Sequence, residues 1–254
     1  MFGKTLSTFA AAAALFASAT ADVAPGFPIP AAGQLTVIYG NNTVSPPGER
    51  IPRPETAQPP TILVPQWLPP NSSSTTALLL MVDLDVPRNN TRVQLLHWLA
   101  TNITLYLSPS TGAPTTQLLI RNDAAPAPYL QPSPPVGDVP HSYTFILFPQ
   151  PADFRLPPQY ANLSTARVPF NVAQFAADVG LGSALAGNYI TVQNLTGSAT
   201  ATFPPARPTA SPTPSGNGTV VFTGATMRAA SLDSAAMWLG LAAAMLVGVM
   251  AVGF

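Results

Sequence analysis

The sequence predicts a mainly β domain of sandwich type, with one or two short helices near its C-terminal part. The apolar stretches are short and rich in β-branched and aromatic residues, and Pro, Gly and Asn bound them. Only one stretch repeats its apolar residues at the spacing of a helix. We therefore expect antiparallel or mixed sheets to form the core.

Five stretches meet these criteria for strands. In chain order they are LTVIYG (35–40), ALLLMVDLDV (77–86), HWLATNITLYL (97–107), QLLI (117–120) and SYTFILF (142–148). The helical candidate is FNVAQFAADVGLGSAL (170–185), and Gly180 would end its first part. The residues at helical spacing are Val172, Phe175, Ala176 and Val179. The simplest interpretation of this stripe is ordinary core packing.

Residues 1–21 have the layout of a secretory signal peptide. The chain begins Met-Phe-Gly-Lys, continues through a run rich in Ala, Leu and Phe, and reaches ATA just before Asp22. A basic start, a short apolar run and an Ala-x-Ala-like site predict cleavage after Ala21. The alternative is a buried N-terminal helix.

Residues 235–254 are uncharged and mostly apolar, and as a helix they would span roughly 30 Å. No Lys or Arg follows them, and the small residues GAT (224–226) and a partly polar spacer precede them. This order is typical of a glycolipid (GPI) anchor signal, with residues 225–254 removed in the mature protein. Gly224 is the preferred attachment site and Asn217 a weaker one, while a true transmembrane helix is the alternative. The anchor would hold the exported protein on the extracellular face of the plasma membrane or in the cell wall.

The folded domain is expected over residues 22–200, with its core at about 35–195. Residues 201–224 begin with a run of Pro, Ser, Thr and Gly that has little to bury, which predicts an extended, O-glycosylated stalk. Seven Asn-x-Ser/Thr triplets in the exported chain indicate a glycosylated surface, although Asn102 falls inside a strand pattern and is doubtful. The six predicted acceptors are Asn41, Asn71, Asn89, Asn162, Asn194 and Asn217.

Composition excludes several classes of protein. The chain has no Cys, so a secreted domain of this sequence must depend on its core rather than on disulfides. Its 10 basic and 10 acidic residues give no net charge, so we expect no nucleic-acid partner. The sequence also offers no Cys nucleophile and no G-x-S-x-G motif. We therefore predict no enzyme, no catalytic residue and no cofactor.

Two scarce carboxylates follow a strongly apolar run. Asp83 and Asp85 lie two residues apart and should share one face of a strand that ends before the turn PRNNTR (87–92). If the next strand pairs antiparallel, its beginning brings His97 beside them. His141 opens a third strand and has Tyr143 on the same face. Spacing alone therefore predicts a cluster of both histidines of the chain with two carboxylates.

Other interpretations of this cluster stay open. Asp85 by itself could cap a turn, since Asp commonly does so after a strand. A single histidine in a strand is more often a core residue with satisfied hydrogen bonds than a ligand. A two-His, two-Asp metal site would be better supported by a short spacing such as H-x-H, which the sequence lacks, so we predict no metal.

Three segments resemble the signatures of the phosphatidylethanolamine-binding proteins. They are DLDVP (83–87), HWLATNI (97–103) and PPVGDVPHSYTFILF (134–148), in the order and at the distances of that family's motifs. The similarity covers about residues 35–195. This chain departs from the motifs at Leu84, where Pro is usual, and at Ser133, where Gly is usual.

This resemblance implies a β-sandwich with a small anion pocket at one end, usually without catalytic activity. The family positions that would surround the pocket match Asp83, Asp85, His97, Pro135, His141 and Tyr143, with Tyr129 near its rim. With the predicted signal and anchor, the chain resembles a secreted, GPI-anchored member of fungal type. Both histidines would donate hydrogen bonds to phosphate oxygens, so phosphate-type ligands are expected to bind more tightly near pH 5–6 than near pH 8.

The leading hypothesis is a non-catalytic surface protein that binds a small anion or a phospholipid head group of phosphate or phosphoethanolamine type. The second hypothesis is an inhibitor or interaction partner of a secreted protease, as some members of the family are. The third is a passive cell-wall glycoprotein, which the stalk, the triplets and the anchor fit equally well. The membrane would be a partner only through the anchor.

Overall fold

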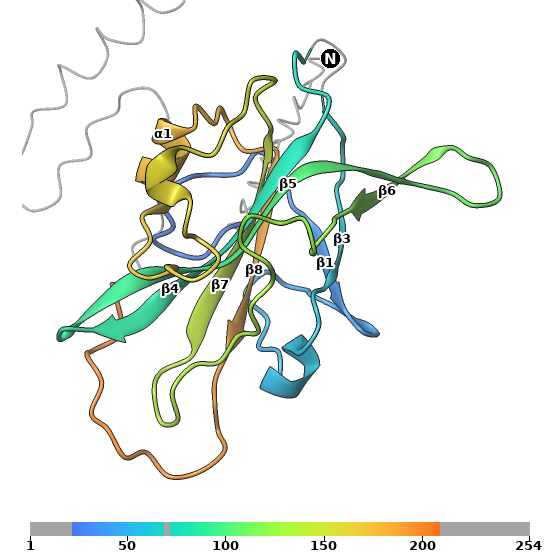
Figure 1. The fold of residues 1–254 in the computed structure, drawn as a ribbon. Coiled ribbons are helices and arrows are strands. Elements are labelled where there is room, and N and C mark those ends of the chain that lie inside the picture. Colours follow the sequence, from blue (N-terminus) through green and yellow to red (C-terminus); the bar gives the residue numbers. More distant parts are fainter. Residues whose placement is uncertain (1–21, 69–71, 209–254) are drawn as a thin grey trace, which may run out of the picture. The chain divides into compact units, whose positions relative to one another are not determined.

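The computed structural model describes residues 22–68 and 72–208 (Figure 1). The predicted signal peptide, the Asn71 and Asn217 triplets, most of the stalk, Gly224 and residues 225–254 lie outside these ranges and stay predictions. None of the described helices is long and apolar enough to cross a membrane.

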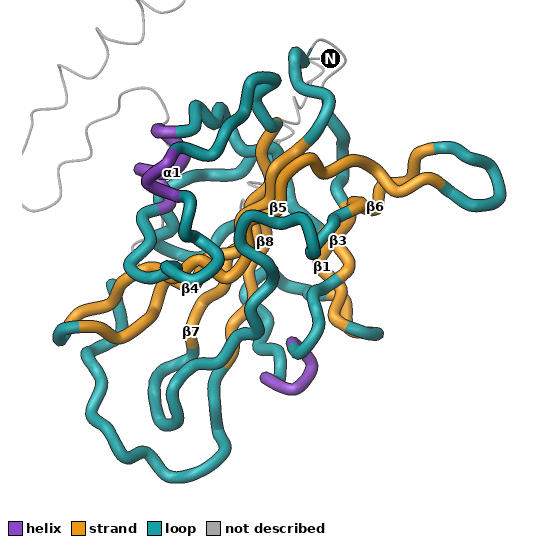
Figure 2. Tube along the Cα trace, viewed as in Figure 1, coloured by secondary structure: helices purple, strands orange, loops and turns teal. Residues whose placement is uncertain are grey.

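The described chain forms one antiparallel sheet of eight strands in the order β2-β1-β3-β6-β5-β4-β7-β8 (Figures 1 and 2). The predicted mainly β fold is confirmed, with the four longest strands at β5, β4, β7 and β8. The strands are β1 (Thr36–Tyr39), β2 (Asn42–Thr43), β3 (Thr61–Leu63), β4 (Ala77–Arg88), β5 (Thr91–Leu107), β6 (Pro114–Leu119), β7 (His141–Pro149) and β8 (Ala186–Val192).

The sheet curves until its two ends meet. The Leu35 amide donates to the Gly187 carbonyl at 2.8 Å, and the Gly187 amide donates to the Gly33 carbonyl at 2.8 Å. The segment before β1 therefore pairs in parallel with β8, at the far end of the strand order. One apolar cluster accordingly contains residues of β1 and β3 together with residues of β7 and β8.

A second apolar cluster covers the other face of the central strands. In β4, Leu79 and Met81 belong to the first cluster and Leu78 and Leu80 to the second, as the alternation of a strand requires. The short helix α1 (Val172–Asp178) packs against the second cluster through its buried residues, which include Phe175. Two 3₁₀ turns complete the fold, η1 (Arg53–Thr56) and η2 (Pro158–Tyr160).

The helix is shorter than the predicted stretch 170–185. Asn171 caps its start, because the Asn171 side chain accepts from the Gln174 amide at 3.0 Å. Gly180 has a φ of +68° just beyond the helix end, which confirms the predicted stop. The chain then enters β8, which is not among the five predicted strand stretches.

The central hairpin joins β4 and β5 through a turn of two residues. Asn89 and Asn90 have φ values of 49° and 60°, the left-handed conformation that such a turn requires and that Asn tolerates. Arg88 pairs with Thr91 across the turn. Both strands therefore extend to this turn, which is shorter than the predicted turn 87–92. Asp85 lies three residues before the end of β4, and His97 lies inside β5 rather than at its start.

The predicted glycosylation sites that are described are mostly accessible. Asn41, Asn89 and Asn162 are exposed and Asn194 is partly buried. Asn102 is also exposed, with a φ of 55°, where the pairing of β4 with β5 shifts between Leu79–Ala100 and Ala77–Ile103. Whether any of them carries a glycan stays a prediction.

Replacing Leu80 with Ala should strongly destabilise the fold. Leu80 is fully buried and pairs with Leu99 in β5 and Ile146 in β7, so truncation leaves a cavity in the middle of the sheet. We expect a loss of about 2–5 kcal/mol in the free energy of unfolding, measured by chemical denaturation. The control is Leu107→Ala, whose side chain is 55% exposed and should change stability by less than about 0.5 kcal/mol. Equal effects of the two substitutions would contradict the assigned core.

Candidate functional site

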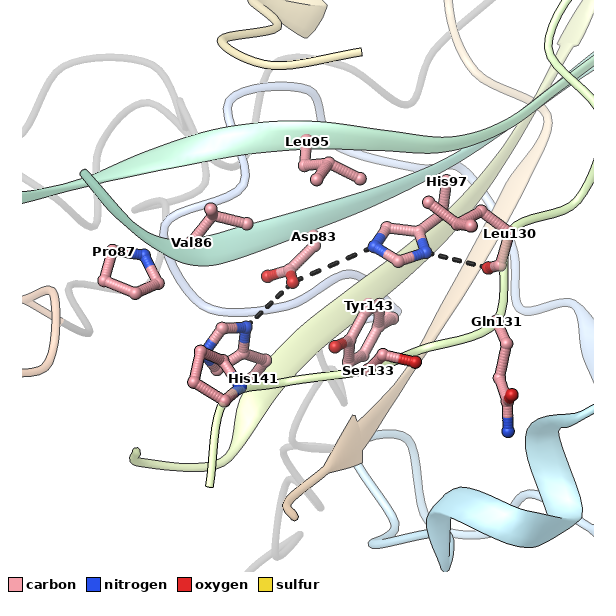
Figure 3. A pocket seen from close by; sticks show the side chains of 11 residues that line it. Asp83, Val86, Pro87, Leu95, His97, Leu130, Gln131, Ser133, His141 and Tyr143 are labelled. Atoms are coloured by element: carbon pink, nitrogen blue, oxygen red, sulfur yellow. Dashed lines mark hydrogen bonds and ion pairs between the residues drawn. The ribbon is translucent and has the colours of Figure 1, made fainter. Parts of the chain in front are cut away.

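A cavity of about 270 Å³ lies where β4, β5 and β7 meet the segment that precedes β7 (Figure 3). Apolar side chains form most of its wall, and the polar groups gather around Asp83 and the two histidines. The lining residues are Asp83, Val86, Pro87, Leu95, His97, Leu130, Gln131, Ser133, Pro135, His141 and Tyr143. We call this cavity the His/Asp pocket.

Asp83 lies at the centre of the His/Asp pocket and is 2% exposed. In the sheet it lies opposite Leu95 of β5 and Tyr143 of β7. Its Oδ1 accepts from the Asp85 amide at 2.7 Å, and its Oδ2 accepts from Nδ1 of His141 at 2.8 Å. One carboxylate oxygen therefore fixes the local backbone and the other holds a histidine.

His141, the first residue of β7, uses both of its ring nitrogens. Nδ1 donates to Asp83, and Nε2 donates to Oδ2 of Asp138 at 3.0 Å. Burial by itself lowers the pKa of His141, but hydrogen bonds to the two carboxylates more than offset this and raise the pKa overall. His141 is therefore held as an imidazolium with no N–H left to donate. The expectation that both histidines donate to a ligand is not met by this geometry.

Asp138 and Arg92 extend this network and were not predicted from the sequence. Both carboxylate oxygens of Asp138 accept from Arg92, at 2.7 and 2.8 Å, and both side chains are buried. Burial raises the pKa of Asp138, but hydrogen bonds from Arg92 and His141 bring it below its ordinary value. The available signal was the position of Asp138 three residues before His141, inside the third family-like segment.

His97 lies in the interior of β5 and behaves differently from His141. Its Nδ1 donates to the Leu130 carbonyl at 2.8 Å, and its Nε2 lies 3.9 Å from Oδ2 of Asp83 (Figure 3). Burial lowers the pKa of His97 although Asp83 acts to raise it. At neutral pH the ring is therefore uncharged, and Nε2 is an acceptor that faces Asp83.

The Tyr143 hydroxyl is a further polar group of the pocket. Tyr143 is fully buried, and its hydroxyl faces Asp83 without a hydrogen bond of ordinary length and angle to any described residue. The oxygen lies on the side of Asp83 and His141 in Figure 3. Burial raises the pKa of Tyr143, and the charge of Asp83 and a weak hydrogen-bonding interaction with its carboxylate raise it further, so the hydroxyl keeps its proton and can donate it. A buried hydroxyl without a partner is costly unless a ligand or water satisfies it.

The described domain matches the model of one known protein family. A model of the phosphatidylethanolamine-binding protein family matches residues 20–200, which is most of the chain. The chain belongs to the phosphatidylethanolamine-binding protein family. Three of the residues described above, Asp83, His97 and His141, come from the three motif segments that first suggested this family.

Two curated relatives are fungal proteins. One is the phomoidride biosynthesis cluster protein N of Talaromyces stipitatus, 36% identical over 118 residues, which are 44% of this chain and 56% of the relative. The other is the protein of the same name from a second fungal species, 34% identical over 121 residues, 45% of this chain and 52% of the relative. The chain thus spans about half the length of the curated relatives it matches.

Two solved structures resemble part of this chain at low sequence identity. A phosphatidylethanolamine-binding protein of Plasmodium falciparum is 22% identical, with a TM-score of 0.46 over 68% of this chain and 90% of its own. A carboxypeptidase Y inhibitor, solved in complex with its cognate proteinase, is 20% identical, with a TM-score of 0.48 over 65% of this chain and 85% of its own. These similarities concern the fold alone.

The structure does not bring Asp85 into the lining of the His/Asp pocket. The pairing of β4 with β5 shifts between Asp83 and Val86, so the alternation that would place both carboxylates on one face is interrupted. Instead, Oδ2 of Asp85 accepts from the Ser142 amide at 2.7 Å, and Oδ1 accepts from Arg207 at 2.9 Å. Asp85 therefore holds the backbone beside the pocket.

Tyr129 also lies outside the pocket lining, although it was predicted at the rim. Its hydroxyl donates to the Thr56 carbonyl at 2.8 Å and lies 3.1 Å from the Tyr39 hydroxyl. Its ring contacts Trp98 edge-on, with the ring centres 5.4 Å apart. Burial raises the pKa of Tyr129 to about 12. Pro135 does line the pocket, as predicted.

The last described residues lie against the back of this cluster, where Figure 1 shows the orange segment passing the β4–β5 hairpin. Arg92 donates to the Pro204 carbonyl at 2.6 Å and to the Pro205 carbonyl at 3.2 Å. Arg207 forms an ion pair with Asp85 and donates to the Pro25 carbonyl. We call residues 204–208 the docked tail. The first part of the predicted stalk thus contacts the domain.

Replacing His141 with Gln should remove a pH-dependent part of the stability. The raised pKa of folded His141 stabilises the protein fully below the unfolded value of about 6.5, and this contribution is lost as the pH rises through the folded pKa. The difference in unfolding free energy between the natural protein and His141→Gln should therefore shrink as the pH rises. Denaturation series between about pH 6 and pH 9 measure it. The pKa of His97 is lowered on folding, so the difference in unfolding free energy between the natural protein and His97→Gln should grow as the pH rises. The same pH dependence in both variants would contradict the opposite pKa shifts of the two histidines.

Replacing Arg207 with Ala should destabilise the protein, because it leaves the buried Asp85 carboxylate without its cation. Arg207 is 16% exposed, and a hydrogen bond to a charged group contributes about 1.5–3 kcal/mol. Chemical denaturation should show a loss of that size. Arg121→Ala is the matched control, because Arg121 is exposed and has no ion pair with any described residue. An unchanged stability in Arg207→Ala would show that the docked tail is not held by this contact.

Proposed function

We propose that this protein binds a small head-group ligand of phosphoethanolamine type in the His/Asp pocket and does not convert it chemically. The observation that carries the proposal is the buried Tyr143 hydroxyl, which lines the pocket without a partner among the described residues. Membership of a family that binds small ligands supports the same conclusion.

The size and lining of the pocket favour a head group over a larger molecule. Its volume of about 270 Å³ lies at the lower limit of small-molecule sites, which are mostly apolar with a few convergent polar groups. Here Asp83, His97 and Tyr143 are the convergent groups, and Leu95, Leu130 and Pro135 contribute to the apolar wall.

The hydrogen bonds of the pocket argue against acyl transfer by a Ser–His pair. Ser133 is the one serine in the lining of the described pocket. Its hydroxyl oxygen accepts from Arg53 at 3.1 and 3.3 Å, and it makes no hydrogen bond to a histidine of the described chain. Both nitrogens of His141 are bound to carboxylates, and Nδ1 of His97 is bound to a carbonyl. A nucleophile activated by an adjacent base is therefore missing from the described pocket.

We place this binding outside the cell, at the plasma membrane or in the cell wall. The predicted signal peptide and anchor signal support this location, and the exposed glycosylation triplets agree with it. Release of the protein from cells by a phosphatidylinositol-specific phospholipase would test the anchor. A protease partner and a passive wall glycoprotein are the competing functions.

Replacing Tyr143 with Phe tests the pocket without disturbing the fold. The hydroxyl has no partner in the described protein, so the variant should keep its unfolding free energy within about 0.5 kcal/mol. Its affinity for O-phosphorylethanolamine, measured by titration calorimetry, should fall about threefold to tenfold because one hydrogen bond to the ligand is lost. Tyr106→Phe, in the exposed part of β5, is the control and should bind as the natural protein does.

Three results would contradict the proposed function. One is the absence of saturable binding by the natural protein, which the passive glycoprotein predicts. Another is equal affinity of the natural protein and Tyr143→Phe. The last is that the protein inhibits a protease, that His97→Ala and His141→Ala inhibit it equally well, and that the natural protein binds no small ligand.

A further inference from the structure

A second cavity, of about 260 Å³, lies between β3 and β6. Within the described chain the two strands pair at one position, Leu63 with Gln117. Beyond it β3 continues beside β1 to Thr61 and β6 continues beside β5 to Leu119, but the two no longer pair with each other. They separate there and leave the cavity between them, which we call the β3–β6 cleft. No residue of its lining also lines the His/Asp pocket.

A buried hydrogen-bond donor lies at this cleft. Trp98 of β5 lines it and is 1% exposed, and its Nε1 has no hydrogen-bond partner among the described residues. Tyr129 packs edge-on against the same ring, but the Tyr129 hydroxyl already contacts the Thr56 carbonyl and the Tyr39 hydroxyl. A buried N–H without an acceptor costs free energy, and a buried Trp usually has one. A ligand oxygen inside the β3–β6 cleft would remove this cost.

Two side-chain amides and a second aromatic ring add to this lining. The Oδ1 atom of Asn122 accepts from the Tyr129 amide at 2.8 Å, which leaves the side-chain NH₂ group of Asn122 as a donor. Gln117 adds a second amide, with one donating and one accepting end. Tyr106 is 37% exposed and gives the opening of the cleft an aromatic surface. The β3–β6 cleft thus leads from an exposed ring to a buried donor.

The lining favours a neutral ligand that is held by side chains. No residue that lines the cleft is charged, so an ion would lose its water there without gaining a counter-charge. Pro59 and Pro60 line the cleft just before β3 and have no backbone N–H. They disfavour an added peptide strand, because such a strand binds through main-chain hydrogen bonds. A pyranose ring, with apolar C–H faces and hydroxyl groups around its edge, matches both the aromatic rings and the amides.

We propose that the β3–β6 cleft binds one neutral hexose unit of a polysaccharide. Tyr106 packs against a C–H face of the sugar, Gln117 and Asn122 bond to its hydroxyl groups, and Nε1 of Trp98 donates to an oxygen at the inner end. The volume of the cleft lies just below the range of about 300–1,000 Å³ for small-molecule sites, so a single ring enters and the rest of the polymer stays outside. This binding goes beyond the proposed function and uses no residue of the His/Asp pocket. At the location proposed above, wall polysaccharides would be within reach.

Titration calorimetry with oligosaccharides of equal length tests this site. The probes are laminarihexaose, mannohexaose and hexagalacturonate. The first two are neutral and represent two sources of a hexose, glucan and mannan, whereas the third carries a carboxylate on every unit. We expect saturable binding of at least one neutral probe, and at least about tenfold weaker binding of hexagalacturonate, because its carboxylates find no cation in the cleft.

Variants locate the binding. Tyr106→Ala should lower the affinity for the bound neutral probe by about threefold or more, because the aromatic surface is lost. Gln117→Ala should do the same through the loss of hydrogen bonds. Neither side chain is fully buried, so both variants should fold and should still bind O-phosphorylethanolamine as the natural protein does. Gln66→Ala, at an exposed glutamine outside the cleft, is the control and should change neither affinity.

Any of three outcomes would overturn this site. Neither neutral probe binds saturably, or hexagalacturonate binds as tightly as the neutral probes do. The third is that Tyr106→Ala and Gln117→Ala both keep the natural affinity for the sugar, which would place the sugar elsewhere on the protein. None of these outcomes bears on the ligand of the His/Asp pocket, because the two cavities share no residue.

Discussion

The imidazolium of His141 between Asp83 and Asp138 is the interaction on which the site depends. It joins the middle of β4 to the start of β7, and through Asp138 it reaches Arg92 of β5. The cluster contains three carboxylates, and each has a cation: His141 for Asp83, Arg92 for Asp138 and Arg207 for Asp85. Each of these carboxylates is therefore paired, and His97 faces the cluster through its Nε2, 3.9 Å from Oδ2 of Asp83.

Such a cluster is not an efficient way to stabilise a fold. Removing charges from water costs several kcal/mol per ion, and their mutual attraction offsets this only when the hydrogen bonds are well formed. The β4, β5 and β7 strands already bury a large apolar core, so the sheet has another source of stability. The arrangement of donors and acceptors is the more important consequence, because it commits both ring nitrogens of His141 to carboxylates and leaves Nε2 of His97 and the Tyr143 hydroxyl at the cavity.

The sequence pattern was sufficient to predict the strands that carry this site, but not the hydrogen bonds and ion pairs between its side chains. Periodicity and motif order give the positions of β1, β4, β5, β6 and β7 and the presence of Asp83, His97 and His141 in one place, but they miss β2, β3 and β8. Asp85 could not be placed, because the shift in strand pairing after Asp83 leaves no trace in the period-two pattern. The Arg92–Asp138 pair joins residues 46 positions apart, and sequence spacing alone does not reveal such a contact.

The docked tail shows how far this charge network extends. Arg92 binds Asp138 on one side and the carbonyls of Pro204 and Pro205 on the other. Arg207 returns from the docked tail to Asp85, whose other oxygen accepts from the amide of Ser142, next to His141. The same carboxylates therefore hold both the back of the pocket and the docked tail. A change of charge at this cluster has to be accommodated at both places, because neither Arg92 nor Asp85 can move for one partner without losing the other.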